Sequence, residues 1–168
     1  MARRIDHRSR SRWDARTVYA ALVDEGCLKQ RLAALGGQNA EIVARTVDAG
    51  GAALKLRHGV AAKDLPPAVR TLLGGDLRID RTETWRVDPA GGYSGTVAVT
   101  IPSMPGQMGG KQRLRDTGSG SELVVDASVE IPIPFVGGRI EETVVQQISS
   151  LLDAEHKFTE EWLGQHQK

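Results

Sequence analysis

The sequence predicts an α+β fold in which a curved antiparallel sheet of seven strands wraps around a long C-terminal helix. Residues 121–132 alternate between apolar and polar side chains, which is typical of a strand with one buried face. After Gly137 and Gly138 the period changes, and apolar residues recur at helical spacing over 136–163. A helix of about 25 residues is about 37 Å long, so it needs a long concave surface to pack against. The segments before it are mostly strand-like, so we expect a curled sheet to supply that surface.

The N-terminal third predicts one strand followed by two short helices. Residues 2–12 alternate weakly, with arginines on the face that we expect to be exposed. Asp14 fits a helix N-cap, and the helical pattern that follows is interrupted by a glycine. We therefore expect helices at about 15–24 and 27–35.

The middle of the chain predicts three pairs of strands joined by short turns, which makes neighbouring strands antiparallel. Six Gly-Gly pairs are spread along the chain, and we interpret most of them as boundaries between elements. Residues 64–73 carry a Pro pair and a short helical pattern, so we expect a crossover or a one-turn helix there, and 102–110 is expected to be a flexible loop. The paired strands are 40–48 with 52–60, 76–88 with 92–101, and 111–117 with 121–132.

The sequence does not decide which face of the strand at 40–48 points inward. Ile42, Ala44 and Thr46 form one candidate face, and Val43 and Val47 form the other. Neither set is apolar enough to decide between them.

Composition excludes several classes of protein. The chain has 168 residues, a net charge of +1 and 26% charged residues, so we expect one domain and no nucleic-acid partner. No apolar run approaches a membrane span and no signal peptide is evident, so we expect a cytoplasmic protein without stable membrane insertion, as a monomer or weak dimer. The N-terminal arginines are interpreted as the solvated face of an edge strand.

Two segments carry a resemblance to a known superfamily. WDARTVYAALVDEGCLKQRLAALG, residues 13–36, matches a strand that runs into a helix pair, and IPIPFVGGRIEETVVQQISSLLDAEHKFTEEWL, residues 131–163, matches a last strand, a glycine turn and a long helix. The chain resembles the START-like (SRPBCC) superfamily, whose helix-grip fold is shared by the birch pollen allergen, lipid-transfer START domains, polyketide cyclases and coenzyme Q-binding proteins. The resemblance implies an uncharacterised bacterial branch, and a cavity between sheet and helix that holds an apolar or amphipathic molecule. It implies no catalytic residues, because the superfamily has no shared catalytic signature.

The strand at 76–88 carries the most informative polar residues. Arg81 and Glu83 fall on the same face as Ile79 and Trp85, so an inward apolar face would bring both charges into the cavity. A buried charge has to be paired or solvated. The two residues are either a polar anchor for a ligand carboxylate or hydroxyl, or a structural ion pair, or they lie at a strand end that opens to solvent.

Histidine and cysteine give weaker signals. His58 shares a face with Leu54 and Leu56, where it is either an acid/base or ligand contact, or a core histidine bonded to a neighbour. His7 on the first strand is a weaker candidate, and the four histidines have no paired spacing. Cys27 is the only cysteine and is interpreted as buried packing. We therefore expect no metal site and no cofactor.

Two methionines and the aromatic content bear on the ligand. Met104 and Met108 flank Pro105 and Gly106 in the expected loop, where they form either an adaptable apolar lid or ordinary packing on the sheet edge. Aromatic residues are 4% of the chain, which counts modestly against a cyclase of aromatic polyketides.

The leading hypothesis is a non-enzymatic protein that binds or carries a lipid-like molecule between the sheet and helix 136–163. One alternative is a cyclase or hydratase that uses His58 or Glu83 as acid or base in the same cavity. Another is an interaction module with a filled core. Beside the polar candidates and the two methionines, the expected apolar wall is Leu54, Leu56, Ile79, Trp85, Val97, Val99, Val125, Val129, Ile140, Val144, Ile148 and Leu151.

Overall fold

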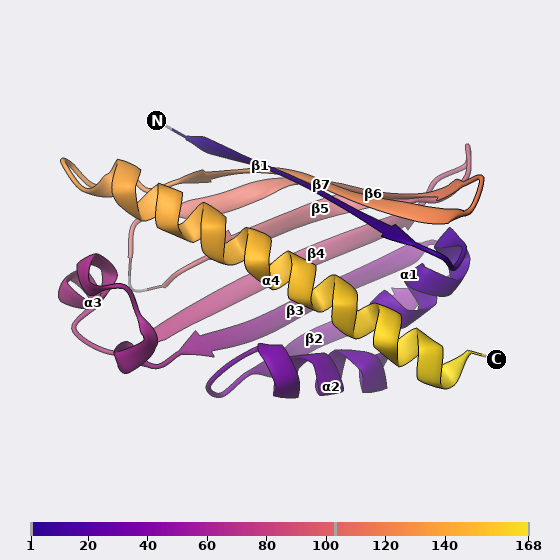
Figure 1. The fold of residues 1–168 in the computed structure, drawn as a ribbon, viewed down its shortest axis with the longest axis horizontal. Helices are drawn as coiled ribbons and strands as arrows, with labels where there is room; N and C mark the ends of the chain where they lie inside the picture. The colour runs from indigo at the N-terminus through magenta and orange to yellow at the C-terminus, as the bar shows by residue number, and fades with distance from the viewer. Residues whose placement is uncertain (1, 103, 168) are drawn as a thin grey trace.

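A computed structural model describes residues 2–102 and 104–167 and confirms the predicted α+β architecture. Seven antiparallel strands form one sheet in the order β1-β7-β6-β5-β4-β3-β2, and a long C-terminal helix crosses it (Figure 1). The strands are β1 (Arg3–Ser11), β2 (Glu41–Asp48), β3 (Gly51–Val60), β4 (Leu77–Val87), β5 (Tyr93–Thr100), β6 (Gln107–Thr117) and β7 (Gly120–Glu130). The helices are α1 (Ala15–Val23), α2 (Glu25–Leu35), the short 3-10 turn η1 (Ala62–Asp64), α3 (Pro67–Leu73) and α4 (Gly137–His166).

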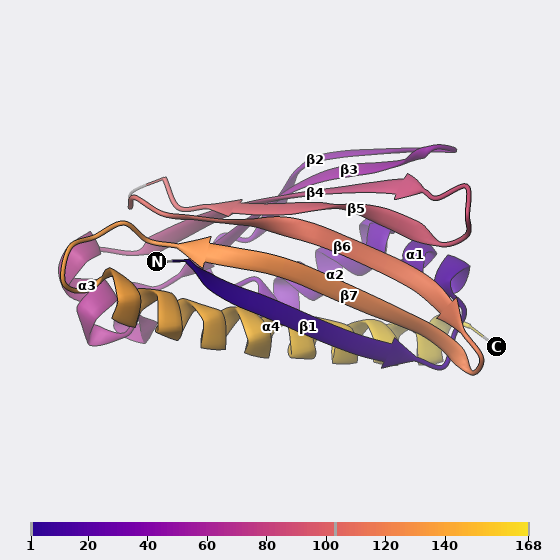
Figure 2. The same cartoon turned by 90° about the horizontal axis from the view of Figure 1, so that it is seen from above.

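The sheet curls so that its β1 edge lies next to α4. Figure 2 shows α4 running along one face of the sheet, with β1 beside it. The alternation predicted for β1 is present: Ile5, His7 and Ser9 are buried, while Asp6 and Arg8 between them are exposed. The curl and the helix together enclose the space in which the site lies.

The two N-terminal helices follow each other with a single residue between them. Asp14 caps α1 as predicted, because its carboxylate accepts a hydrogen bond from the Thr17 amide at 2.8 Å. The break falls at Asp24, one to two residues earlier than predicted. Asp24 ends α1 and also caps α2, since its side chain accepts from the Cys27 amide at 2.8 Å. The boundary between the two helices therefore lies at the capping residue Asp24 and not at Gly26, which suggested it in the sequence.

Two segments differ from their predicted form. The expected loop at 102–110 is shorter, because β6 already begins at Gln107 and Met108 lies in that strand. Residues 67–73 form a helix of about two turns, α3, that starts with Pro67 and ends at Gly74 in the left-handed conformation.

The structure resolves the open question at β2. Ile42 is half-buried and packs against the buried leucines of α2, whereas Val43 and Val47 are exposed. A register shift between Ile42 and Ala44 breaks the alternation. Beyond it, both faces of this edge strand are open to solvent, which explains why its pattern was ambiguous.

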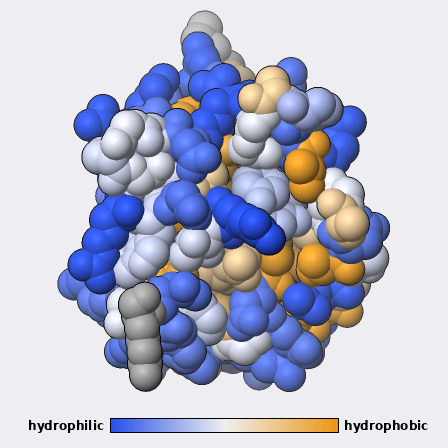
Figure 3. Space-filling view, turned by 90° about the vertical axis from the view of Figure 1, so that its right-hand side faces the viewer, coloured by the Kyte–Doolittle hydropathy of each residue, from blue (hydrophilic) through white to orange (hydrophobic). Residues whose placement is uncertain are grey.

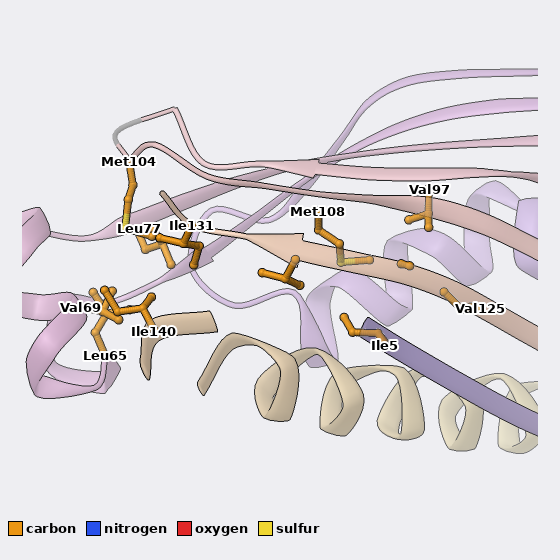
Figure 4. Packing of buried hydrophobic residues seen from close by; sticks show 12 residues of the cluster. Ile5, Leu65, Val69, Leu77, Val97, Met104, Met108, Val125, Ile131 and Ile140 are labelled. Carbon is orange, nitrogen blue, oxygen red and sulfur yellow. The ribbon is translucent and has the colours of Figure 1, made fainter. Parts of the chain in front are cut away.

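The start of α4 is tied to the end of β7. The buried carboxylate of Glu141 accepts a hydrogen bond from the Ile131 amide at 2.8 Å. Around this turn, Ile131 and Ile140 pack with side chains of α3 and of the β5–β6 connection (Figure 4). This contact fixes one end of α4 over the sheet, so the residues along the helix face the inner strands.

Candidate functional site

A cavity of about 340 Å³ lies between the inner face of the sheet and α4. Its walls come from most strands of the sheet, from α2 and α3, and from the middle of α4. The volume is at the low end of the range of roughly 300–1,000 Å³ that is usual for small-molecule sites. One part of the wall, which we call the apolar half, consists of Leu65, Val69, Leu77, Ile79, Ile101 and Met104.

The apolar half lies at the α3 end of the molecule. Figure 4 shows Leu77 and Met104 close together there, opposite Leu65 and Val69 of the α3 segment. Leu65, Val69, Leu77 and Met104 are buried and belong to one core with Ile140 of α4. These side chains offer apolar contact to a bound molecule, and Asp64 lines the cavity beside them.

The opposite end of the cavity is closed by a separate apolar core. Trp85 of β4 and Leu114 of β6 pack there with Leu163 of α4. Tyr19 of α1 meets Trp85 edge to face, with ring centroids 6.1 Å apart. Hydrophilic side chains cover most of the outer surface at this end (Figure 3).

Between these two ends lies a group of buried charged and polar side chains, which we call the charged cluster: Arg31, His58, Arg81, Glu83 and Glu155. They come from α2, β3, β4 and α4, and each is 7% exposed or less. The Arg81 Nη1 atom donates to both carboxylate oxygens of Glu155, at 3.0 and 2.9 Å. The Arg81 Nε atom lies 3.4 Å from Glu83 Oε2, so one guanidinium bridges two carboxylates.

This pairing keeps the buried groups charged. Burial by itself would lower the pKa of Arg81, but Glu155 and Glu83 raise it above its ordinary value. Burial likewise opposes the charge on Glu155, yet Arg31 and Arg81 hold the pKa of that carboxyl below its usual range. The cluster is thus two cations and two anions whose formal charges cancel.

Arg31 is the less completely bonded cation of the cluster. Its Nε atom lies 3.7 Å from Glu155 Oε2, within ion-pair range. Among the residues that the structure describes, the buried Nε and Nη2 atoms of Arg31 have no hydrogen-bond partner. The two arginines therefore differ: Arg81 donates two hydrogen bonds to Glu155, whereas Arg31 contacts the same carboxylate only by charge.

The position of Arg31 depends on how α2 ends against β3. Gly37 and Gly59 form a bridge, in which the Gln38 amide donates to the Gly59 carbonyl at 3.1 Å and the Gly59 amide donates to the Gly36 carbonyl at 3.0 Å. A Cβ at Gly37 would overlap the Gly59 carbonyl, and Gly37 has φ of 79°. Glycine is required for this close approach, which brings α2 next to His58.

His58 is buried beside both arginines. Burial lowers the pKa of His58 to about 4, and the positive charge of Arg81 adds to this effect. The imidazole is consequently neutral at pH 7, and its buried Nε2 atom has no hydrogen-bond partner among the described residues.

A second polar group reaches the cavity from β1. The His7 Nε2 atom shares a hydrogen bond of 2.6 Å with Ser9 Oγ, and His7 Nδ1 lies 3.6 Å from the carboxylate of Asp153 on α4. Burial lowers the pKa of His7, an effect that Asp153 partly offsets. His7 therefore lies on the cavity wall, although its position in the first strand made it a weaker candidate in the sequence.

Most of the residues predicted for the site do lie on the cavity wall. They include the polar candidates and both methionines, which are buried in the core and do not form an exposed lid. The predicted residues that line the cavity are His58, Ile79, Arg81, Glu83, Trp85, Val97, Val99, Met104, Met108, Val125, Val144, Ile148 and Leu151.

The remaining four predicted residues are buried outside the lining. Leu54 and Leu56 point at α2 and pack with its leucines. Val129 and Ile140 belong to the core near the β7–α4 turn. Residues of one strand face can thus contact a covering helix at one point and a cavity at another, which alternation alone does not distinguish.

Sequence reasoning missed Arg31 and Glu155. Both lie in helices, where a charged residue is ordinarily assigned to the solvent face. The inward charges of Arg81 and Glu83 were the available signal of a buried charged group here, but nothing in the local pattern named Arg31 or Glu155 as further members.

Other groups give no sign of a separate site. Cys27 is buried, and burial raises the pKa of its thiol to about 11, as expected for a packing residue. Within residues 2–102 and 104–167, no three metal-ligating side chains come together. In the same part of the chain, no helix has the length and apolar character needed to cross a membrane.

Comparison with known proteins identifies the family. The family described as "Protein of unknown function (DUF2505)" matches residues 6–163. The chain belongs to this family. It is also 31% identical, over 106 residues, to the uncharacterized protein Rv0481c of Mycobacterium tuberculosis. That match covers 62% of the chain and only 61% of the mycobacterial protein.

Solved structures share the fold at low sequence identity. The protein TTHA0849 from Thermus thermophilus superposes with a TM-score of 0.66 at 17% identity, covering 99% of this chain and 100% of that one. The ZhuI aromatase/cyclase from a Streptomyces species superposes with a TM-score of 0.65 at 14% identity, covering 100% and 97%. The fold of the DUF2505 chain is therefore the helix-grip fold of the START-like superfamily, as the sequence resemblance predicted.

Proposed function

We propose that this protein binds or carries a hydrophobic or amphipathic small molecule in the cavity between the sheet and α4. The observation that carries this proposal is the cavity itself, about 340 Å³ in volume, with a lining that is mainly apolar. An apolar surface that stays unfilled inside a protein is costly, and burying a ligand there removes apolar area from water. The helix-grip fold, which it shares with an aromatase/cyclase, supports a ligand in this position.

Domain organisation, oligomeric state and location in the cell are also part of this proposed function. We propose that the 168 residues work as one domain, as a monomer or weak dimer in the cytoplasm, with the cavity residues as ligand contacts. The apolar half would hold the body of the ligand, and the charged cluster would face its polar end.

Native mass spectrometry tests the proposal. The protein is purified without detergent, incubated with a panel of medium-chain alcohols, ketones and fatty acids, and compared under native and denaturing conditions. We expect an adduct in 1:1 ratio that is lost on denaturation. A bare protein mass with every compound, and after purification alone, would count against a binding protein.

The second candidate is an enzyme of the cyclase or hydratase type acting in the same cavity. The observation in its favour is His58, an imidazole on the cavity wall whose buried Nε2 atom has no hydrogen-bond partner among the described residues, although a pKa of about 4 makes it a weak base. Glu83 is less suited to this role, because it is ion-paired with Arg81. If His58→Ala and Glu83→Gln both retain ligand affinity, and no bound compound is converted by the unaltered protein, the enzyme hypothesis fails.

A further inference from the structure

The charged cluster and the apolar half are arranged in sequence along β4. Leu77 and Ile79 belong to the apolar half, and Arg81 and Glu83 follow on the same face of the strand. Residues two and four positions apart on a strand are roughly 7 and 14 Å apart. A molecule whose polar end lies at the cluster therefore has its body alongside Ile79 and Leu77.

Two of the buried cluster atoms without a hydrogen-bond partner among the described residues are donors, Nε and Nη2 of Arg31, and a third is the His58 Nε2 atom. Both oxygens of Glu155 already accept from Arg81, and Glu83 is paired with the same guanidinium. The side chain of Arg31 lines the cavity. A guanidinium has only donors, so its complement is an acceptor oxygen. Buried donors without a partner are disfavoured, and a ligand oxygen would relieve this.

The charge balance of the cluster limits what that oxygen can belong to. Arg31 and Arg81 are offset by Glu83 and Glu155, and His58 is neutral. A carboxylate would add a third anion next to two buried ones, in a site where net charge is costly. An ammonium group would add a third cation beside two guanidinium groups, with the neutral imidazole nitrogen of His58 as a weak compensation. A carbonyl or hydroxyl oxygen accepts from Arg31 and leaves the balance unchanged.

We propose that the ligand is an uncharged amphipathic molecule whose carbonyl or hydroxyl oxygen accepts hydrogen bonds from Arg31, while its apolar body lies in the apolar half. The site then selects neutral amphipaths over their carboxylate counterparts. This inference rests on the proposed binding function and specifies the ligand class for the same cavity.

A matched set of compounds tests the inference. 2-Decanone, 1-decanol and decanoate share one chain length and differ in the polar end. Each compound is titrated against the fluorescent probe N-phenyl-1-naphthylamine, and its displacement of the probe is measured at pH 8, where decanoate is ionised. For the unaltered protein we expect the ketone or the alcohol to bind at least tenfold more tightly than decanoate. This ratio needs no variant, so it does not depend on the folding of a mutant.

The variant Arg31→Met identifies the donor. In a variant that circular dichroism shows to be folded, the exchange should weaken binding of the preferred neutral compound about tenfold more than it weakens binding of the probe. Equal or tighter binding of decanoate would overturn the inference, and so would an Arg31→Met protein with unaltered affinity for ketone and alcohol. If neither the probe nor any of the three compounds binds, the proposed binding function itself fails, which is a distinguishable result.

Discussion

The apolar half and the charged cluster line the same cavity, but they are held in place in different ways. Leu77 and Met104 occupy their positions through non-directional contacts with neighbouring apolar side chains. Arg81 and Glu155 depend on each other, at 2.9 and 3.0 Å, across a sequence separation of 74 residues. The first arrangement tolerates changes of shape, whereas the second is sensitive to the loss of a single charge.

The largest expected effect is on the charged cluster. Glu155→Gln keeps the size of the side chain but leaves Arg81 and Arg31 without their shared anion. Removing one partner of a buried ion pair costs about 3–5 kcal/mol, because the remaining charge stays buried. We expect a loss of this size in the free energy of unfolding measured with urea. Glu142→Gln, an exposed position on the same helix, is the matched control and should change little.

If Glu155→Gln unfolds at the same urea concentration as Glu142→Gln, the cluster does not carry paired charges in the folded state. The distinction between the two regions of the cavity would then be wrong.

An intermediate effect is expected from the pH dependence of His58. Burial lowers its pKa from 6.5 to about 4 in the folded protein. Between these pH values the unfolded chain binds the proton and the folded protein does not, so stability falls as the pH drops from 6.5 towards 4. Over this whole pH range, protonation of His58 in the unfolded chain lowers the free energy of unfolding by roughly 3 kcal/mol.

The variant His58→Gln should lack this contribution, so its stability should decline less steeply over the same pH range. His7 titrates in both proteins and cancels in the comparison, although burial lowers its pKa as well. Urea denaturation at pH 7, 6 and 5 measures the difference. Parallel curves for the two proteins would mean that His58 is not buried beside the arginines.

The smallest effect is expected in the apolar half. Met104→Leu conserves both volume and apolar character, and such exchanges usually cost less than about 1.5 kcal/mol. Thermal and urea denaturation should show a small shift, and binding of the neutral probe should be retained. A loss as large as that of Glu155→Gln would show that the apolar half requires specific shape as strictly as the cluster requires charge.

The same comparison shows what the sequence could reveal. Alternation identified the inward face of β4 and placed Arg81 and Glu83 on it, because strand period is a local property. Glu155 and Arg31 could not be found this way, since a helix buries a charged residue only when a partner from another element receives it. The close approach of Gly37 to Gly59, which sets α2 beside His58, is likewise visible only in three dimensions.

The fold was more predictable than the site for a physical reason. The long amphipathic helix and the regular strands leave few ways to bury their apolar faces together. Which buried side chains meet a cavity and which meet a helix depends on small displacements of α2 and α4. Leu54 and Leu56, predicted for the cavity, pack instead on α2 for this reason.

The most direct test of the account is whether filling the cavity abolishes binding. Val144→Trp places a large side chain on the cavity wall, and Val47→Trp makes the same exchange at an exposed position of β2. Both proteins are titrated with N-phenyl-1-naphthylamine after circular dichroism has shown that they are folded. The account predicts saturable binding by the unaltered protein and by Val47→Trp, and at least a tenfold loss of affinity in Val144→Trp. Equal affinity in all three proteins would contradict a ligand site between the sheet and α4.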